Sequence, residues 1–220
     1  MDLSFSKNYG VNSIILNGES KKVVLAPVPK DFGEVYKTAD FVVVTKLSQE
    51  NAALENKQLF SMKTDQSGFV VATPGEYEKD DIFVSARHNH KDGDVSSDSQ
   101  PMSSATFSPS SAFGLDVVEV EVEGVNILYY ASSEIINKTI LSELADIHIL
   151  IIDLADDITN QLKVINKVDP QVVIPFSDNK SLVEEFKKES GVNYTESKKY
   201  KFKLSNFVNE EYVLTGMDLS

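Results

Sequence analysis

The chain has 220 residues, and 41% of them are apolar, which is enough to bury a sizeable core as one large domain or two fused halves. Its 34 acidic and 21 basic side chains give a formal charge of -13, which repels nucleic-acid phosphates and anionic membrane surfaces. Because the sequence contains no cysteine, disulfides, thiolate metal sites and cysteine nucleophiles are excluded.

Nothing in the sequence predicts insertion into a membrane or export. No apolar run approaches the roughly 18 to 20 residues that a helix needs to cross a bilayer. The first ten residues, MDLSFSKNYG, lack the basic start and apolar centre of a signal peptide. We therefore expect a cytoplasmic protein whose partners include neither nucleic acid nor a membrane.

The first half of the chain is predicted to form short strands joined by turns. Val11–Leu16 and Lys22–Ala26 flank the dipeptide Asn17-Gly18, which is a strong hairpin signal. The segment PGEYEKDDIFVSARH predicts a turn that leads into another strand. Further strand-like pieces lie at 40–45, 58–62 and 69–74, and the polar stretch that runs to Asn56 is compatible with a helix.

Residues 91–112 form a serine-rich segment, KDGDVSSDSQPMSSATFSPSSA, with almost no aliphatic side chains. Such a composition cannot bury enough apolar surface to order itself. We expect a mobile loop, either a binding loop or a disordered insertion.

The second half begins with a hairpin and then alternates strands with helices. Residues 115–122 and 125–130 flank the turn Glu123-Gly124, and continuous apolar runs at 148–154 and 171–176 predict strands covered on both faces. Helical patterns lie within 132–145, 156–169 and 178–191, the last with Gly191 as its stop. The chain ends in a predicted strand pair at 199–204 and 211–214, and the alternation in KYKFKL is typical of a half-buried strand. This order predicts a sandwich of two mixed sheets with helices outside.

The stretch FVVATPGEYE spans residues 69–78, and its last five residues, Pro74–Glu78, resemble the PGEYE segment of the ascorbate-phosphate-lactonase-like branch of the metallo-β-lactamase superfamily. Four further pieces resemble this branch in order and spacing: SIILNGESKKVVLAPVP, ADFVVVT, EGVNILYYAS and VDPQVVIPF. The resemblance covers about Val11 to Gly191. It implies an α/β fold with a single domain over 1–220, a four-layer αββα sandwich with a metal cleft at one edge.

The resemblance also implies that most of the metal ligands are replaced. The four positions of the family's His-x-His-x-Asp-His motif fall at Lys46, Ser48, Glu50 and Asn51. The other ligand positions of the branch fall near Asn12, Ala26, Ser132 and Ser177. Only Glu50 keeps a plausible ligand type. A lysine at the first position puts a cation where a dication should sit, and at about 4 Å their repulsion is on the order of a few kcal/mol.

These replacements favour a catalytically inactive member of the fold, a pseudoenzyme that acts as a binding or structural subunit without cofactor or metal. Since active relatives in this branch commonly form homo-oligomers, the resemblance implies self-association or a protein partner. The vestigial cleft is a candidate site for a small anionic ligand, with Lys46 receiving the anion. Its candidate residues are Lys46, Ser48, Glu50, Asn51, Ser132, Ser177 and Asp178.

Two enzyme hypotheses compete with this interpretation. A metal-dependent hydrolase of a phosphorylated or lactone-type metabolite would use a non-standard site built from Glu50, Asp178 and either His88 or His90, although exposure in a loop is the simpler interpretation of both histidines. A serine hydrolase with Lys46 as its base is the other hypothesis, but nothing in the sequence positions an oxyanion hole.

The remaining polar candidates have structural explanations. His148 begins a buried strand, where we expect a structural ring that donates to a backbone carbonyl. Asp153, Asp156 and Asp157 follow a strand end, where loop solvation and helix capping are expected in preference to a cation site.

Overall fold

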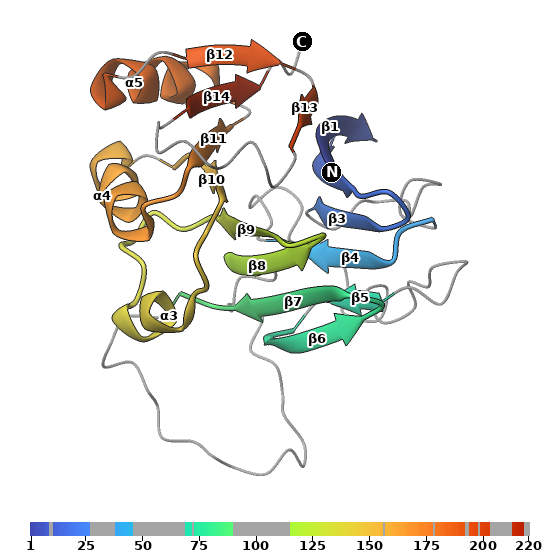
Figure 1. Cartoon of the computed structure of the whole chain (residues 1–220). Helices are drawn as coiled ribbons and strands as arrows, with labels where there is room; N and C mark the ends of the chain where they lie inside the picture. The colour runs from blue at the N-terminus through green and yellow to red at the C-terminus, as the bar shows by residue number, and fades with distance from the viewer. Residues whose placement is uncertain are drawn as a thin grey trace.

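The chain folds into two β-sheets that pack face to face, with helices on one side (Figure 1). The computed structural model describes residues 1–8, 11–26, 38–45, 69–71, 73–89, 115–155, 157–177, 179–191, 194–197, 199–202 and 213–217. The sandwich of two mixed sheets expected from the sequence is confirmed.

The smaller sheet has the strand order β13-β1-β2-β3-β4-β5. Its strands are β1 (Asp2–Asn8), β2 (Val11–Asn17), β3 (Lys22–Ala26), β4 (Phe41–Val44), β5 (Phe69–Val71) and β13 (Lys199–Lys201). The predicted hairpin at Asn17-Gly18 is confirmed, because β2 and β3 pair antiparallel up to Asn17 and Lys22. Strands β3, β4 and β5 pair in parallel, so their carboxyl ends lie at one edge.

The larger sheet has the order β12-β14-β11-β10-β9-β8-β7-β6. Its strands are β6 (Gly75–Lys79), β7 (Ile82–Arg87), β8 (Val117–Val122), β9 (Val125–Tyr130), β10 (Ile149–Asp153), β11 (Val172–Phe176), β12 (Tyr194–Ser197) and β14 (Val213–Met217). The strands from β6 to β9 pair antiparallel, and those from β9 through β10, β11 and β14 to β12 pair in parallel.

Three described helices, α3 (Lys138–Glu143), α4 (Ile158–Val168) and α5 (Lys180–Ser190), lie on the face of the larger sheet that points away from the smaller one (Figure 1). Their ends follow the expected signals. Asp157 caps α4 by accepting from the N–H of Asn160, and Gly191 ends α5 in the left-handed conformation. None of these helices is long and apolar enough to cross a membrane.

The core has two main layers, one on each face of the larger sheet, and successive residues of β8, β9, β10 and β11 contribute to the two layers in turn. Val118 and Val120 of β8 point toward the smaller sheet, whereas Leu150 and Ile152 of β10 pack under the helices. Both faces of β10 and β11 are therefore buried, as their continuous apolar runs predicted. A separate apolar cluster on the outer face of the smaller sheet comprises Ile15, Val24, Ala39 and Val42.

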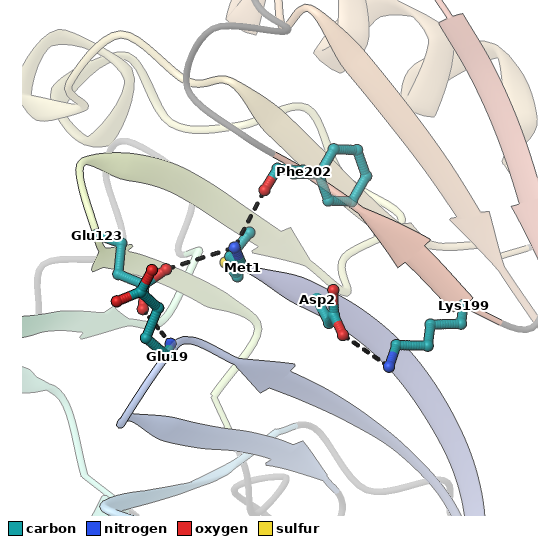
Figure 2. A network of polar contacts seen from close by, with 6 residues as sticks. All are labelled: Met1, Asp2, Glu19, Glu123, Lys199 and Phe202. Carbon is teal, nitrogen blue, oxygen red and sulfur yellow. Dashed lines mark hydrogen bonds and ion pairs between the residues drawn. The ribbon is translucent and has the colours of Figure 1, made fainter.

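The first residue of the described chain joins the two sheets (Figure 2). The Met1 ammonium donates to the carbonyl oxygen of Phe202 at 3.1 Å and lies 3.4 Å from a carboxylate oxygen of Glu123, which belongs to the β8–β9 turn. Beside it, Asp2 pairs with Lys199 of β13 at 2.6 Å, at a more exposed position. The edge of the smaller sheet is thus held to a hairpin of the larger one.

Two expectations about strands were wrong. The PGEYE segment does not merely turn into a strand, because Gly75–Lys79 is itself a strand, and Asp80 and Asp81, both with positive φ, make the turn to β7. The two last strands also do not pair with each other: β13 joins β1 in the smaller sheet, whereas β14 lies between β11 and β12 in the larger one. Alternation predicts a strand but carries no information on its partner.

Other expectations lie outside the described residues. These are the helix that ends near Asn56, the strand at 58–62, the serine-rich loop at 91–112 and the fourth, helical layer on the smaller sheet.

Candidate functional site

The two sheets meet at the edge where the parallel strands β9, β10 and β11 end. Leu115 joins them, because its N–H donates to the carbonyl oxygen of Val44 at 3.0 Å and it forms a parallel bridge with Thr45 at the end of β4. The carbonyl oxygen of Asp116 then accepts from the N–H of Ala131, just after β9, at 2.8 Å. In sheets of this kind, ligands bind beyond the carboxyl ends of the strands, so this edge is the candidate site.

The structure places two of the predicted site residues at this edge. Ser132 follows β9 and Ser177 follows β11, the two strands that flank β10, and both side chains are buried. The other predicted residues, Lys46, Ser48, Glu50, Asn51 and Asp178, lie outside the described residues, as do the side chains of Asn12 and Ala26.

Asn89 is the centre of a buried hydrogen-bond network beside Ser132. Its Nδ2 donates to the hydroxyl of Tyr130 at 2.8 Å, and its Oδ1 accepts from the N–H of Asn137 at 2.8 Å. Its own N–H donates to Oδ1 of Asp116 at 2.9 Å. With 8% of its surface exposed, Asn89 links the end of β7, the residue before β8 and the start of α3.

The hydroxyl of Ser132 is part of this network. Its Oγ accepts from the N–H of Glu134 at 3.2 Å and lies 3.4 Å from Nδ2 of Asn89. Only 4% of Ser132 is exposed. The oxygen therefore shapes the turn after β9 instead of facing an open cleft.

Two tyrosines of β9 point to opposite faces of the sheet near this edge. Tyr130 donates its hydroxyl proton to the carbonyl oxygen of Glu134 at 2.5 Å, and burial raises its pKa. Tyr129 lies in the layer between the sheets and donates to Oδ2 of Asp153 at 3.2 Å. Burial, and next the charge of Asp153, raise the pKa of Tyr129 well above its usual value, so both phenols remain protonated donors at neutral pH.

Ser177 has a comparable structural task at the end of β11. Its Oγ accepts from the N–H of Asn179 at 3.1 Å, and Asn179 in turn caps α5 by accepting from the N–H of Ser181 at 3.0 Å. Ser177 therefore fixes the turn between the strand and the helix.

The two described histidines, His148 and His88, have partners within the fold. His148 has a structural partner, because its Nδ1 accepts from the N–H of Asn126 at 3.0 Å. Nδ1 of His88 lies 3.8 Å from Asp116, and a third of the side chain is exposed, so His88 is less exposed than a free loop residue. His90 lies outside the described residues.

The acidic candidates beyond β10 also have structural partners. Asp157 caps α4, as expected, and Asp153 accepts from Tyr129. Asp156 lies outside the described residues.

The described residues at this edge do not fit the dinuclear metal that the resemblance implies. Such a metal needs histidine nitrogens and carboxylates. Ser132 and Ser177, the two predicted ligand positions whose side chains the structure describes, instead offer neutral hydroxyls. Both hydroxyl oxygens accept from backbone N–H groups. Within the part of the chain that the structure describes, no group of three or more histidine, aspartate or glutamate side chains is arranged to hold a metal.

The sequence did not identify the residues that organise this edge. Asn89, Asp116, Tyr129 and Tyr130 were not predicted to belong to it. Asn89 stands between two more conspicuous histidines, and it is 27 residues from Asp116 and 41 from Tyr130 along the chain. A weak signal was present, since Asp116 is a charged residue at the start of an apolar strand pattern.

Comparisons with known proteins identify the fold. No family model matches the chain, and no curated protein does. Among solved structures, a protein from Thermotoga maritima assigned as a zinc-dependent hydrolase of the metallo-β-lactamase superfamily is similar over 99% of both chains, with a TM-score of 0.61 and 12% sequence identity. CmlA, a diiron β-hydroxylase from Streptomyces venezuelae, gives a TM-score of only 0.42 at 10% identity, over 80% of this chain and 44% of its own. At these identities the similarity concerns architecture alone: the chain has the sandwich fold of the metallo-β-lactamase superfamily.

Proposed function

We propose that this protein is a catalytically inactive member of the metallo-β-lactamase fold, and that it acts by binding, as a structural or oligomeric subunit. The observation that carries the proposal is the state of Ser132. The resemblance puts a metal-bridging aspartate near this position, but here the buried hydroxyl of Ser132 accepts from the N–H of Glu134 and lies against Asn89.

The surroundings of Ser132 support a structural role for this edge. A metal cleft needs ligands that are held in place but still available to the ion. The polar atoms of Asn89 and Asp116 are instead hydrogen-bonded to Tyr130, to Asn137 and to each other. The network therefore makes the segment around Ser132 rigid, as metal coordination would otherwise do.

The proposed binding role includes a partner and a ligand class. Self-association or a protein partner follows from the resemblance to oligomeric relatives. The ligand class is a small anion. Lys46 is the proposed receiver of this anion, and the further candidate residues are Ser48, Glu50, Asn51 and Asp178.

Elemental analysis of the purified protein tests the proposal first. We expect near-zero zinc, manganese, iron and nickel per chain, with no increase and no thermal stabilisation after incubation with each metal. The competing hydrolase predicts one or two metals per chain. It also predicts that Glu50→Gln and Asp178→Asn release this metal, whereas the proposal predicts that neither variant changes metal content.

A second measurement separates the two forms of the binding role. Light scattering after size exclusion gives the oligomeric state, and we expect a self-associated species or, if the chain is monomeric, a defined complex with another protein. A monomer that binds no protein and no anion would contradict the proposal.

A further inference from the structure

The larger sheet ends in the edge strand β6. This strand pairs with β7 over its whole length, and no described strand lies on its other side (Figure 1). Gly75 is exposed, and because glycine has no side chain, this exposure belongs to the backbone itself. An edge of this kind presents N–H and C=O groups to which a further strand can be added.

The turn between β6 and β7 determines which backbone groups face outward. Asp80 and Asp81 have φ of 51° and 65° and make a two-residue turn, so Lys79 exchanges hydrogen bonds with β7. Bonded and non-bonded residues alternate along an antiparallel pair. The N–H and C=O groups of Glu76 and Glu78 therefore point away from β7, and no backbone group of the described chain bonds to them there.

The side chains of β6 give this edge two different faces. Tyr77 packs against the core between the sheets, so Glu76 and Glu78 point to the opposite face. Both glutamates are exposed, and neither carboxylate forms an ion pair with a described residue. On the face of Tyr77, the ammonium of Lys79 lies 5.9 Å from the centre of the Phe69 ring.

Phe69 adds exposed apolar surface beside this edge. Its ring lies against that of Phe41, with the ring centres 5.5 Å apart, but 47% of Phe69 is exposed. It belongs to β5, the last described strand of the smaller sheet, so the two sheets have open edges on the same side of the sandwich (Figure 1). Aromatic side chains are enriched in protein interfaces.

The charge of the edge discriminates between possible occupants. A second copy of β6 in register would place glutamates beside glutamates, and like charges directly opposite destabilise a strand pair. A strand with lysine or arginine at every second position would instead place cations opposite both carboxylates. Its intervening side chains would point toward Tyr77 and Phe69, and apolar ones fit that face.

We propose that β6 binds an extended peptide segment in which basic and apolar residues alternate, as an added strand of the larger sheet. The backbone of the segment bonds to the outward N–H and C=O groups of Glu76 and Glu78, whose carboxylates pair with its basic side chains. Its apolar side chains contact Phe69. The proposal goes beyond the binding role above, because it gives the partner a chemistry, and it does not depend on whether the edge at Ser132 binds metal.

Fluorescence anisotropy of a labelled peptide of alternating lysine and valine, KVKVKVK, titrated with the full chain, tests this assignment. We expect saturable binding that weakens as salt is added. Three related peptides should bind at least tenfold more weakly. They are EVEVEVE, which reverses the charge, KSKSKSK, which lacks the apolar side chains, and KVKVKVK methylated at every backbone nitrogen, which cannot donate hydrogen bonds to a strand.

A charge-reversed variant places the binding on β6. The double substitution Glu76→Lys and Glu78→Lys should raise the Kd of KVKVKVK at least tenfold. The matched control is Glu185→Lys with Glu189→Lys, which changes the net charge equally at exposed positions of α5, far from β6 (Figure 1), and it should change the Kd less than twofold. Circular dichroism checks that both variants are folded.

Several results would overturn the assignment. KVKVKVK that does not bind, or that binds both double variants equally, places no basic strand at β6. Equal binding of the methylated peptide would mean that charge acts without an added strand. A dimer of the unchanged chain that sedimentation shows to be lost in the Glu76→Lys, Glu78→Lys variant would assign the edge to a second copy. None of these results depends on metal content, which tests the edge at Ser132 separately.

Discussion

Hydrogen bonds between buried polar residues stabilise the candidate edge, and Asn89 is the centre of this network. The side chain of Asn89 satisfies the hydroxyl of Tyr130 and the N–H of Asn137, while its own N–H is bonded to Asp116. Asn89→Ala should lower the free energy of unfolding by about 2 to 3 kcal/mol, because it leaves buried partners unpaired. Urea unfolding measures this, with Asn160→Ala as the control at a more exposed polar pair on α4. Equal losses in the two variants would mean that burial of the network does not matter.

Glu119 makes stability depend on pH. Burial raises its pKa, although the N–H of Ala145 and the charge of Arg87 oppose the shift and the neighbouring Glu121 adds to it. A raised pKa in the folded state means that the native state binds the proton of Glu119 more tightly than the unfolded state does. The stabilisation from this proton is fully present below the unfolded-state pKa and is lost as the pH rises through the folded-state pKa. Glu119→Gln should therefore be more stable than the unchanged chain at pH 7, with the advantage shrinking toward pH 4. Urea unfolding across this range checks the sign, and a constant difference would contradict it.

Single residues were the least predictable level of this protein. Ser132 and Ser177 were assigned to the edge because the resemblance aligned them with ligand positions. The partners of Ser132 could not be assigned, since Asn89 is 43 residues away along the chain and has no distinctive spacing. Hydrogen bonds between distant residues depend on sheet order, and alternation does not encode this order.

At the level of elements, the helix ends were predictable because their signals are local. Gly191 has φ of +65° at the end of α5, and a β-carbon there would meet no atom within 4 Å. Gly191→Ala should therefore cost about 1 kcal/mol through the backbone alone. Gly191→Asn should cost less, because asparagine adopts this conformation more readily. Thermal unfolding of both variants measures the difference, and no loss in the alanine variant would exclude the left-handed cap.

The hairpins and the doubly buried strands were predictable for the same reason. Asn17-Gly18 and Glu123-Gly124 mark turns, and the apolar runs of β10 and β11 show that both faces are covered. The strand in PGEYE was missed, since a glycine, a tyrosine and two glutamates resemble a turn more than an edge strand. Its pairing with β7 supplies what its composition does not.

At the scale of the whole molecule, the contacts around Met1 are one of the connections between the two sheets. Glu123→Gln should lower the free energy of unfolding by about 1 kcal/mol, since this carboxylate pairs with the Met1 ammonium and accepts from the N–H of Glu19. Asp2→Asn is the matched control at an exposed pair with Lys199, where salt screens the attraction, and it should change stability little. Urea unfolding at low and high salt compares the two. A larger loss for Asp2→Asn would show that the sheets are not joined through Glu123.

The pairing of β1 with β13 also constrains the order of events during synthesis. Residues 2–4 lie beside residues 199–201, so this side of β1 lacks its partner strand until residues 199–201 have left the ribosome. An unpaired strand edge is a template for association with other chains, and contacts this distant in sequence form slowly. The growing polypeptide therefore carries this unpaired strand edge while the intervening residues are made, and a pause in translation before residue 199 would prolong the period in which nascent chains can aggregate through β1.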